Sequence, residues 1–229
     1  DFGLIEPMIV VWPAGLGSDL SKRHMWTDSE RNGNYESLVV VDLLNWLTDS
    51  GFNVSQAREQ RAFGGFSMGG DGAIRMAIRN SDKCIAFVSH SGGPAVQWFR
   101  TRFPLVLAEC PESAPPYTYN PGNGFWTDVF FGIASAFSPS MSNPPWNLDF
   151  PLLPDGNEHE PAFTGDWVAN HDPATLIQNP EVYTRDVSMY FEVGTSDPWM
   201  YESNVLLDQE LTSLGVPHTF STFAGGHDL

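Results

Sequence analysis

The sequence has few basic residues. Of its 229 residues only 11 are Lys or Arg, against 28 Asp or Glu, which gives a formal net charge of −17 at pH 7. Nucleic-acid phosphates and anionic membrane surfaces are bound through clusters of Lys and Arg, which this composition does not supply. We therefore expect neither a nucleic-acid partner nor a membrane partner.

Long apolar runs and cysteines are also scarce. No stretch approaches the roughly 18 consecutive apolar residues of a transmembrane helix. Cys84 and Cys110 are the only cysteines. Two cysteines determine neither a pairing nor a compartment, so one disulfide and two free thiols both stay open. The 8 Trp and 18 Pro residues favour a secreted or extracellular protein, with a cytoplasmic one as the alternative.

The length and the 41% hydrophobic content predict one folded domain over residues 1–229. Short apolar segments alternate with segments of helical periodicity, which is the pattern of an α/β protein with a mostly parallel central sheet and helices on both faces. The predicted strands are Met8–Trp12, a segment around Ala62, Ile85–Ser89, Val187–Gly194 and His218–Phe223, and the clearest predicted helices are Tyr35–Asp49, Asp71–Arg79 and Glu202–Leu214.

The alternation breaks over residues 94–185, which are rich in proline, asparagine and aromatic residues. We expect this region to be a cap-like insertion over the edge of the sheet where the parallel strands end. Ligands bind at that edge in open α/β sheets. The aromatic side chains could form a small core of their own or line a pocket, and the sequence leaves both open.

The most informative motif is Gly65-Phe66-Ser67-Met68-Gly69, a G-x-S-x-G pattern between a predicted strand and a predicted helix. That context predicts a nucleophile elbow, in which Ser67 adopts a strained backbone conformation and presents its hydroxyl above the sheet. We expect side chains at Gly65 and Gly69 to collide, because strand and helix approach closely there. A plain glycine-rich turn is the alternative.

A nucleophilic serine requires a histidine that accepts its proton. His227 follows the last predicted strand on a Gly-Gly loop, where this class of enzyme carries its base. His90 follows the strand after the elbow helix, so we expect it to line the site. For the remaining histidines we expect structural or surface roles, with His171 bracing a turn; the others are His24, His159 and His218.

The acid that orients the histidine should follow the preceding strand, and Asp197 in Gly194-Thr195-Ser196-Asp197-Pro198 occupies that place. Asp172 is the second candidate, and a turn-capping role is the alternative for Asp197. The side chain of Asp228 should point away from its neighbour His227. Trp199 is a further candidate for substrate binding, together with His90.

The tetrahedral intermediate of acyl transfer needs two hydrogen-bond donors for its oxyanion. The backbone N–H of Met68, directly after the nucleophile, should be one of them. The segment Pro13–Gly17 resembles an oxyanion loop but lies one β–α unit too late in the chain. The second donor is therefore expected to be missing from this sequence.

Five segments in this order resemble the putative-esterase group of α/β-hydrolases, which includes esterase D (S-formylglutathione hydrolase), feruloyl esterases and the antigen 85 mycolyltransferases: Ile9–Pro13, Tyr35–Ser37, Gly65–Gly70, Gly194–Asp197 and Gly225–His227. The resemblance implies that Ser67, Asp197 and His227 match the nucleophile, the acid and the base of that family. It also implies earlier strands with an oxyanion loop before Met8, and a closing helix after His227, which this sequence lacks. A sheet edge left open in this way would attract a second copy or a complementing chain.

The predicted function is that of a serine hydrolase, which cleaves a small-molecule carboxylic ester through an acyl-enzyme on Ser67 and needs no cofactor or metal. Two alternatives remain. An acyltransferase similar to the mycolyltransferases would pass the acyl group to an alcohol or a sugar. A non-catalytic binding protein would keep the fold without the chemistry.

Overall fold

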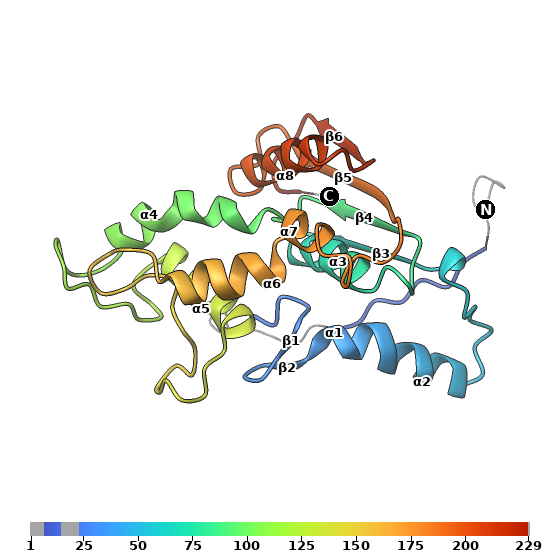
Figure 1. Cartoon of the computed structure of the whole chain (residues 1–229), viewed down its shortest axis with the longest axis horizontal. Helices are drawn as coiled ribbons and strands as arrows, with labels where there is room; N and C mark the ends of the chain where they lie inside the picture. Colours follow the sequence, from blue (N-terminus) through green and yellow to red (C-terminus); the bar gives the residue numbers. More distant parts are fainter. Residues whose placement is uncertain (1–6, 15–22, 229) are drawn as a thin grey trace.

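The computed structural model describes residues 7–14 and 23–228. Its centre is a parallel sheet with the strand order β3-β4-β5-β6 (Figure 1). The strands are β3 (Ala62–Phe66), β4 (Ala86–His90), β5 (Ser188–Gly194) and β6 (Thr219–Phe223). All neighbours pair in parallel, for example Phe66 with His90 and His90 with Glu192. The predicted α/β fold and its parallel sheet are confirmed.

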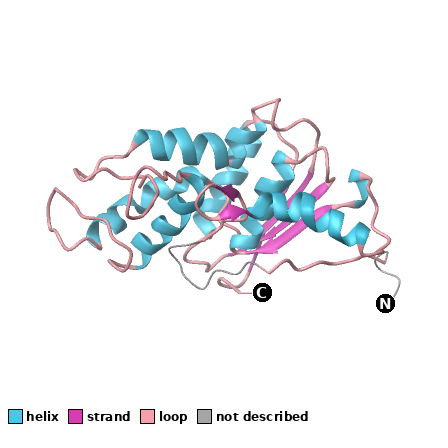
Figure 2. Cartoon of the chain, turned by 90° about the horizontal axis from the view of Figure 1, so that it is seen from below, coloured by secondary structure: helices cyan, strands magenta, loops and turns pink. Residues whose placement is uncertain are grey.

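Helices cover one face of the sheet. α3 (Met68–Arg79) packs on β3 and β4, α8 (Tyr201–Ser213) packs on β5, and α7 (Pro173–Ile177) lies between these helices. On this face Phe87 and Phe191 are almost fully buried, in one apolar cluster with residues of α3 and α8. On the opposite face Val88 is 47% exposed. In the part of the chain that the structure describes, the prediction of helices on both faces is thus confirmed for one face only. Figure 2 shows the strands in magenta among the cyan helices.

The apolar segment Met8–Trp12 is not a strand, which corrects the sequence prediction. Its side chains are exposed, from 38% at Val11 to 91% at Trp12. A strand requires a neighbour whose backbone groups complete its hydrogen bonds. In residues 7–14 and 23–228, β3 pairs only with β4, and Met8–Trp12 pairs with no strand.

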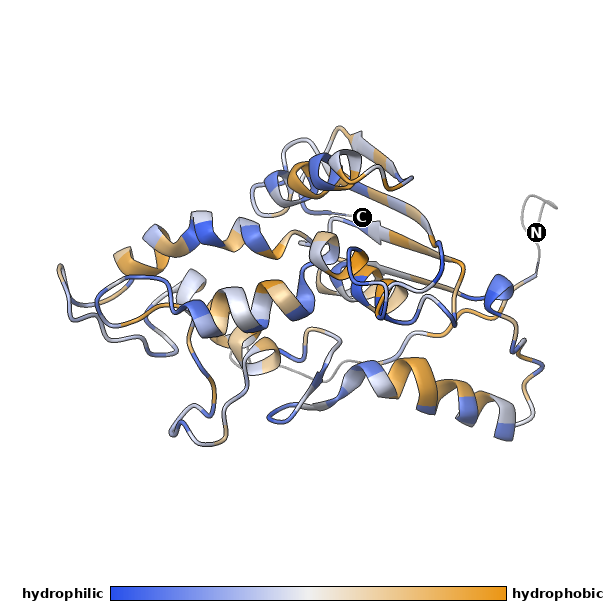
Figure 3. Cartoon of the chain, viewed as in Figure 1, coloured by the Kyte–Doolittle hydropathy of each residue, from blue (hydrophilic) through white to orange (hydrophobic). Residues whose placement is uncertain are grey.

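The predicted helix over Tyr35–Asp49 is confirmed, but its buried face differs. It consists of α1 (Tyr35–Ser37), a π-helical turn over Leu38–Asp42 and α2 (Leu43–Asp49). Val40 and Leu47 are buried, whereas Leu38 and Val41, which the 3.6-residue period places inward, are each 41% exposed. Figure 3 shows the hydrophobic stretch of this helix in orange. A π-helical turn has more residues than an α-helical turn, so it rotates the apolar stripe.

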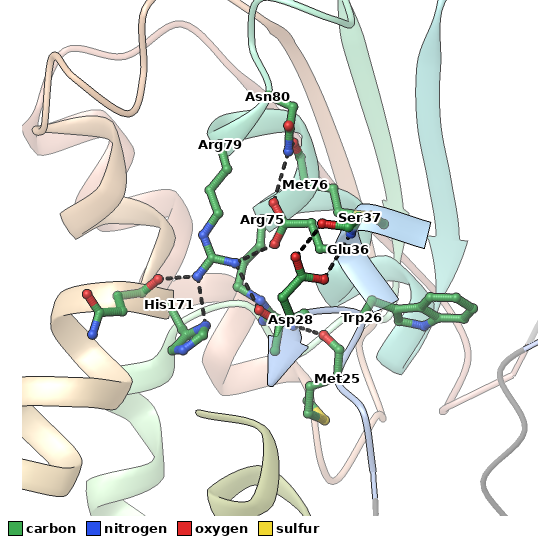
Figure 4. Close-up of polar contacts among 12 residues, drawn as sticks. Met25, Trp26, Asp28, Glu36, Ser37, Arg75, Met76, Arg79, Asn80 and His171 are labelled. Atoms are coloured by element: carbon green, nitrogen blue, oxygen red, sulfur yellow. Dashed lines mark hydrogen bonds and ion pairs between the residues drawn. The ribbon is translucent and has the colours of Figure 1, made fainter. Parts of the chain in front are cut away.

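A hairpin precedes this helix, and polar contacts of Arg79 attach α3 to α1 and α6 (Ala169–His171). The hairpin strands are β1 (Asp28–Ser29) and β2 (Gly33–Asn34). The Arg79 guanidinium lies 2.7 Å from Glu36 Oε2 and 2.8 Å from His171 Nδ1 (Figure 4). Burial, reinforced by nearby Arg79 and Arg75, holds the pKa of His171 well below its usual range, so the neutral ring accepts the Arg79 hydrogen bond. The prediction that His171 has a structural role agrees with this position.

Residues 94–185 fold into helices that surround an aromatic cluster. They comprise a 3-10 helix (Val96–Arg102), α4 (Phe103–Ala108), α5 (Phe125–Phe137), a π-helix (Pro161–Val168), α6 (Ala169–His171) and α7. The cluster joins ring to ring with centroid distances of about 5–6 Å, and its members include Trp98, Phe99, Phe103, Phe130, Phe163 and Trp167. Most of these rings are buried, and they belong to the same apolar cluster as Phe87 and Phe191 of the sheet, so this region extends the main core and does not form a separate one.

The structure decides between a disulfide and two free thiols. Cys84 and Cys110 are both buried and both free, so the alternative of two thiols holds. Burial raises the pKa of Cys84 to about 11, which keeps its thiol protonated and unreactive. No helix in the described residues combines the length and the apolar character needed to cross a membrane.

Candidate active site

Ser67 lies at the sharp turn between β3 and α3, with φ 55° and ψ −123°. Positive φ is costly for a residue with a Cβ and persists only where the surroundings impose it. Here the Ser67 N–H donates to the His90 carbonyl at 2.9 Å, and the Ser67 carbonyl accepts from Asp71 N–H at 3.0 Å. The strained elbow conformation expected from the sequence is confirmed.

The structure corrects which glycines the elbow requires. A Cβ on Gly65 would lie 2.8 Å from Gly70 N and closer still to the Gly69 carbonyl group. A Cβ on Gly69 would meet nothing within 4 Å, so the expected collision there is wrong. Instead, a Cβ on Gly70 would lie 2.6 Å from Ser89 Oγ, because the third residue of α3, not the second, faces the neighbouring strand β4.

Gly65 and Gly69 give a matched pair of variants. Gly65→Ala is expected to lower the free energy of unfolding by about 1–3 kcal/mol or more, because backbone atoms must move to admit the methyl group. Gly69→Ala should be neutral or slightly stabilising, since helix interiors favour alanine over glycine by up to about 1 kcal/mol. Urea denaturation of both variants measures the difference. Equal effects of the two substitutions would contradict this account of the elbow.

The structure brings three predicted site residues into one hydrogen-bonded chain. His227 Nε2 lies 2.9 Å from Ser67 Oγ, and His227 Nδ1 lies 2.7 Å from Asp197 Oδ2. The Asp197 side chain is fully buried, and that of His227 is only 14% exposed. In this arrangement the ring nitrogen facing Ser67 can accept the hydroxyl proton, while the carboxylate holds the proton on the opposite nitrogen.

The two oxygens of Asp197 have different partners. Oδ2 faces His227, while Oδ1 accepts from the backbone N–H groups of Trp199 (2.9 Å) and Met200 (3.0 Å). The Asp197 carboxylate therefore does both things expected of it, since one oxygen caps the turn and the other faces His227. Asp172, the second candidate, caps α7 through Thr175 and accepts from the Val96 N–H, so its oxygens are occupied elsewhere.

His90 does not line the site, which corrects the sequence-based expectation. It is not among the residues that line the cavity at Ser67. Its Nδ1 lies 2.8 Å from Glu192 Oε1 and its Nε2 lies 2.8 Å from the backbone carbonyl of Asp228. The ring lies at the end of β4, on the same face of the sheet as the side chain of its neighbour Glu192 on β5.

The backbone N–H of Met68, predicted to be an oxyanion donor, lies at the start of α3. Met68 is the first residue of α3, and the first N–H groups of a helix have no partner within it. Its N–H is therefore available beside Ser67. The segment Pro13–Gly17, which resembles an oxyanion loop, extends into residues 15–22. These residues lie outside the described ones.

A cavity of about 220 Å³ opens at Ser67. Trp199, predicted as a substrate-binding residue, lines it and places its ring 5.3 Å from that of His227. The other lining residues are mostly apolar and come from α5, the 3-10 helix and the segments beside α3 and α8, including Met25, Trp98, Phe99, Phe125, Trp126, Val129, Ile133 and Met200. Of the two alternatives for the aromatic residues, pocket lining holds for Trp98 and Phe99, which also belong to the main apolar cluster and not to a separate core.

Sequence reasoning missed the charged residues of this cavity, Asp71 and Arg23. Asp71 is buried one helical turn after the elbow and forms an ion pair with the buried Arg75. The i,i+4 spacing of Asp71 and Arg75 on a predicted helix is a signal that could have identified the pair. Arg23 is partly buried at the cavity, and burial lowers its pKa, with the Asp128 carboxylate acting in the opposite direction.

Comparisons with known proteins agree with the fold. The family model described as putative esterase matches residues 1–229. Similar solved structures include a ferulic acid esterase (TM-score 0.50, 20% identity, 89% of this chain and 57% of the other), FphF, a Staphylococcus aureus fluorophosphonate-binding serine hydrolase (0.54, 18%, 90% and 61%), and an S-formylglutathione hydrolase from Agrobacterium tumefaciens (0.54, 15%, 90% and 56%). This chain thus spans between 56% and 61% of the length of these three. Comparison with curated protein sequences returns no match.

Proposed function

The chain belongs to the putative esterase family, and from this premise we propose that it is a serine hydrolase that cleaves carboxylic esters. The observation that carries the proposal is the continuous hydrogen-bonded chain from Asp197 through His227 to Ser67 at the wall of an apolar cavity. Nucleophile, base and orienting acid then have the mutual geometry that acyl transfer requires.

The proposed reaction has two halves. Ser67 Oγ attacks the ester carbonyl carbon while its proton passes to His227 Nε2, and the Met68 N–H donates to the developing oxyanion. The tetrahedral intermediate collapses, the ester C–O bond breaks, and His227 returns the proton to the departing alcohol. Water then attacks the acyl-enzyme, His227 takes one of its protons, and the carboxylic acid leaves as Ser67 recovers its hydrogen.

The cavity supports esters with an apolar acyl or alcohol group. Its volume of about 220 Å³ accommodates a small to medium-sized group, and its walls are mainly aromatic and aliphatic. Phe125 and Trp199 are 48% and 41% exposed with ring centroids 6.4 Å apart, so these two side chains border the entrance. Besides Ser67 and His227, the described lining residues include two charged side chains, Arg23 and Asp71, which could contact a polar group of the substrate.

Covalent labelling tests the proposal. A fluorophosphonate probe added to the purified chain is expected to form one adduct per molecule, mapped to Ser67 by peptide mass spectrometry. The Ser67→Ala variant should form none, and the heat-denatured chain should also stay unlabelled, because an isolated serine is not nucleophilic. An adduct that persists in Ser67→Ala, or no adduct on the folded chain, would refute the proposal. Product analysis of a cleaved ester with and without an added alcohol then separates hydrolysis from acyl transfer.

A further inference from the structure

His90 and Glu192 form a polar cluster beside the site, on the face of the sheet opposite to α3. They are register partners on β4 and β5, and Glu192 Oε2 also accepts from the Tyr190 hydroxyl at 2.7 Å. The His90 ring stacks on Phe223 at 5.0 Å and lies 5.6 Å from Phe66, whose ring is 5.0 Å from that of His227. The cluster is therefore one side chain away from the histidine of the site.

Both ring nitrogens of His90 face hydrogen-bond acceptors. The Glu192 carboxylate is 2.8 Å from Nδ1, and the Asp228 carbonyl is 2.8 Å from Nε2. A neutral imidazole carries one N–H, so either tautomer would leave a nitrogen lone pair directed at an oxygen lone pair. Only the imidazolium ion donates to both partners. This geometry therefore selects the protonated ring.

The bond to Asp228 holds the segment that carries His227. Before His227, the Ser196 N–H donates to the Gly225 carbonyl at 2.8 Å. After His227, the Asp228 carbonyl accepts from His90. His227 is thus fixed between two anchors, one from the loop after β5 and one from the end of β4. Without the bond to His90, the contacts named here that still hold this segment are the Ser196–Gly225 bond and the hydrogen bonds of the His227 ring with Asp197 and Ser67.

We propose that protonated His90 is a positioning residue, which holds the Gly225–Asp228 segment so that His227 stays in line between Ser67 and Asp197. We call the hydrogen bond from His90 to the Asp228 carbonyl the clamp. This inference rests on the proposed function, because it gives the clamp a role in the same reaction. His90 itself does not touch the cavity at Ser67. It acts through the backbone, and its protonation state determines whether the clamp is closed.

The charges around His90 set the sign of the pH dependence. Burial lowers the pKa of His90, but the bonds to the Asp228 carbonyl and the Glu192 carboxylate outweigh it, together with the negative charges of both residues, so the pKa lies above its ordinary value. The remaining groups that face the ring are the Tyr190 hydroxyl, which bonds Glu192, and the rings of Phe66 and Phe223. The clamp is therefore closed below the raised pKa of His90 and opens as the pH rises through that pKa.

Two variants test the clamp by steady-state ester hydrolysis across pH. For His90→Ala we expect kcat about 10- to 100-fold lower at pH 7 with little change in KM, because a displacement of about 1 Å at the base costs up to about 10²-fold in rate. In the wild type, kcat should fall by a similar factor as the pH rises through the pKa of His90. Glu192→Gln should remove that fall, since its amide N–H can donate to Nδ1 of the neutral ring while Nε2–H still donates to Asp228.

His218 provides the matched control. Its Nε2 lies 3.0 Å from Asp208 Oδ1 and its Nδ1 lies 2.8 Å from the Val216 carbonyl, which is the same two-acceptor arrangement at the opposite end of β6. His218→Ala should therefore keep the wild-type pH profile of kcat. The proposal is overturned if His90→Ala retains the wild-type kcat and profile, if Glu192→Gln declines like the wild type, or if His218→Ala reproduces the His90→Ala effect.

A second measurement keeps the inference separate from the proposed function. Ring ¹⁵N NMR should show His90 protonated on both nitrogens at pH 7 in the wild type but not in Glu192→Gln. Hydrogen exchange of the 225–228 amides should quicken in His90→Ala. If the wild type shows no Ser67-dependent hydrolysis, the proposed function fails, and these two readouts still decide the clamp. A neutral His90 at pH 7, or unchanged exchange, overturns the clamp even in an active enzyme.

Discussion

Asp197→Asn is expected to lower kcat for ester hydrolysis by about 10⁴-fold while the protein remains folded. The Asn carbonyl oxygen can replace Oδ1 and keep the turn hydrogen bonds from Trp199 and Met200. The amide nitrogen then faces His227 Nδ1 and donates to it. His227 is forced into the tautomer with its proton on Nε2, so the nitrogen beside Ser67 can no longer accept a proton.

Asp197→Ala separates the two roles of this carboxylate. It should lose the rate and also some stability, because Trp199 and Met200 lose the acceptor for their backbone N–H groups. Steady-state kinetics with a chromogenic ester, beside urea denaturation of each variant, measures both effects. Wild-type kcat in Asp197→Asn would refute the orienting role, whereas equal destabilisation of both variants would refute the capping role.

Arg75→Met is expected to lower the free energy of unfolding by about 3–5 kcal/mol. The Arg75 guanidinium is buried against Asp71, donates to the Met25 carbonyl at 2.7 Å and lies 4.8 Å from the centroid of the Phe137 ring. Burial already raises the pKa of Asp71, against the opposing effect of Arg75. Removing the cation leaves a buried carboxylate without compensation, and the Met25 carbonyl loses its donor.

The matched control is Arg61→Met. Arg61 also donates to a backbone carbonyl, that of Ser55 at 3.0 Å, but it is only partly buried, and it should cost about 0.5 kcal/mol or less. The double variant Asp71→Leu with Arg75→Met should recover part of the loss, since an apolar pair removes both desolvated charges. Denaturant titrations of the wild type, Asp71→Leu, Arg75→Met and the double variant give the coupling energy, and Arg61→Met is titrated beside them. A loss in Arg75→Met no larger than in Arg61→Met would show that the buried pair does not stabilise the fold.

Local pattern was sufficient for the strands, the elbow and the candidate residues. β4 and β5 are short segments rich in apolar residues, β3 and β6 carry aromatic residues among small ones, and the strand–Ser67–helix context follows from a few adjacent residues. The order of Ser67, Asp197 and His227, each after a different strand, also places them at one edge, because parallel strands end at the same edge of a sheet. These predictions need only chain order and strand direction.

The tertiary structure decided what depends on neighbours distant in the sequence. Gly70, not Gly69, faces Ser89, and His90 meets the Asp228 carbonyl instead of the cavity. Met8–Trp12 has the composition of a strand, yet it has no strand partner in the described residues. The local sequence of a segment specifies how apolar the segment is and which hydrophobic period it follows. Its partners, and therefore the direction of each side chain and the role of each polar atom, are set only when segments far apart in the chain come together.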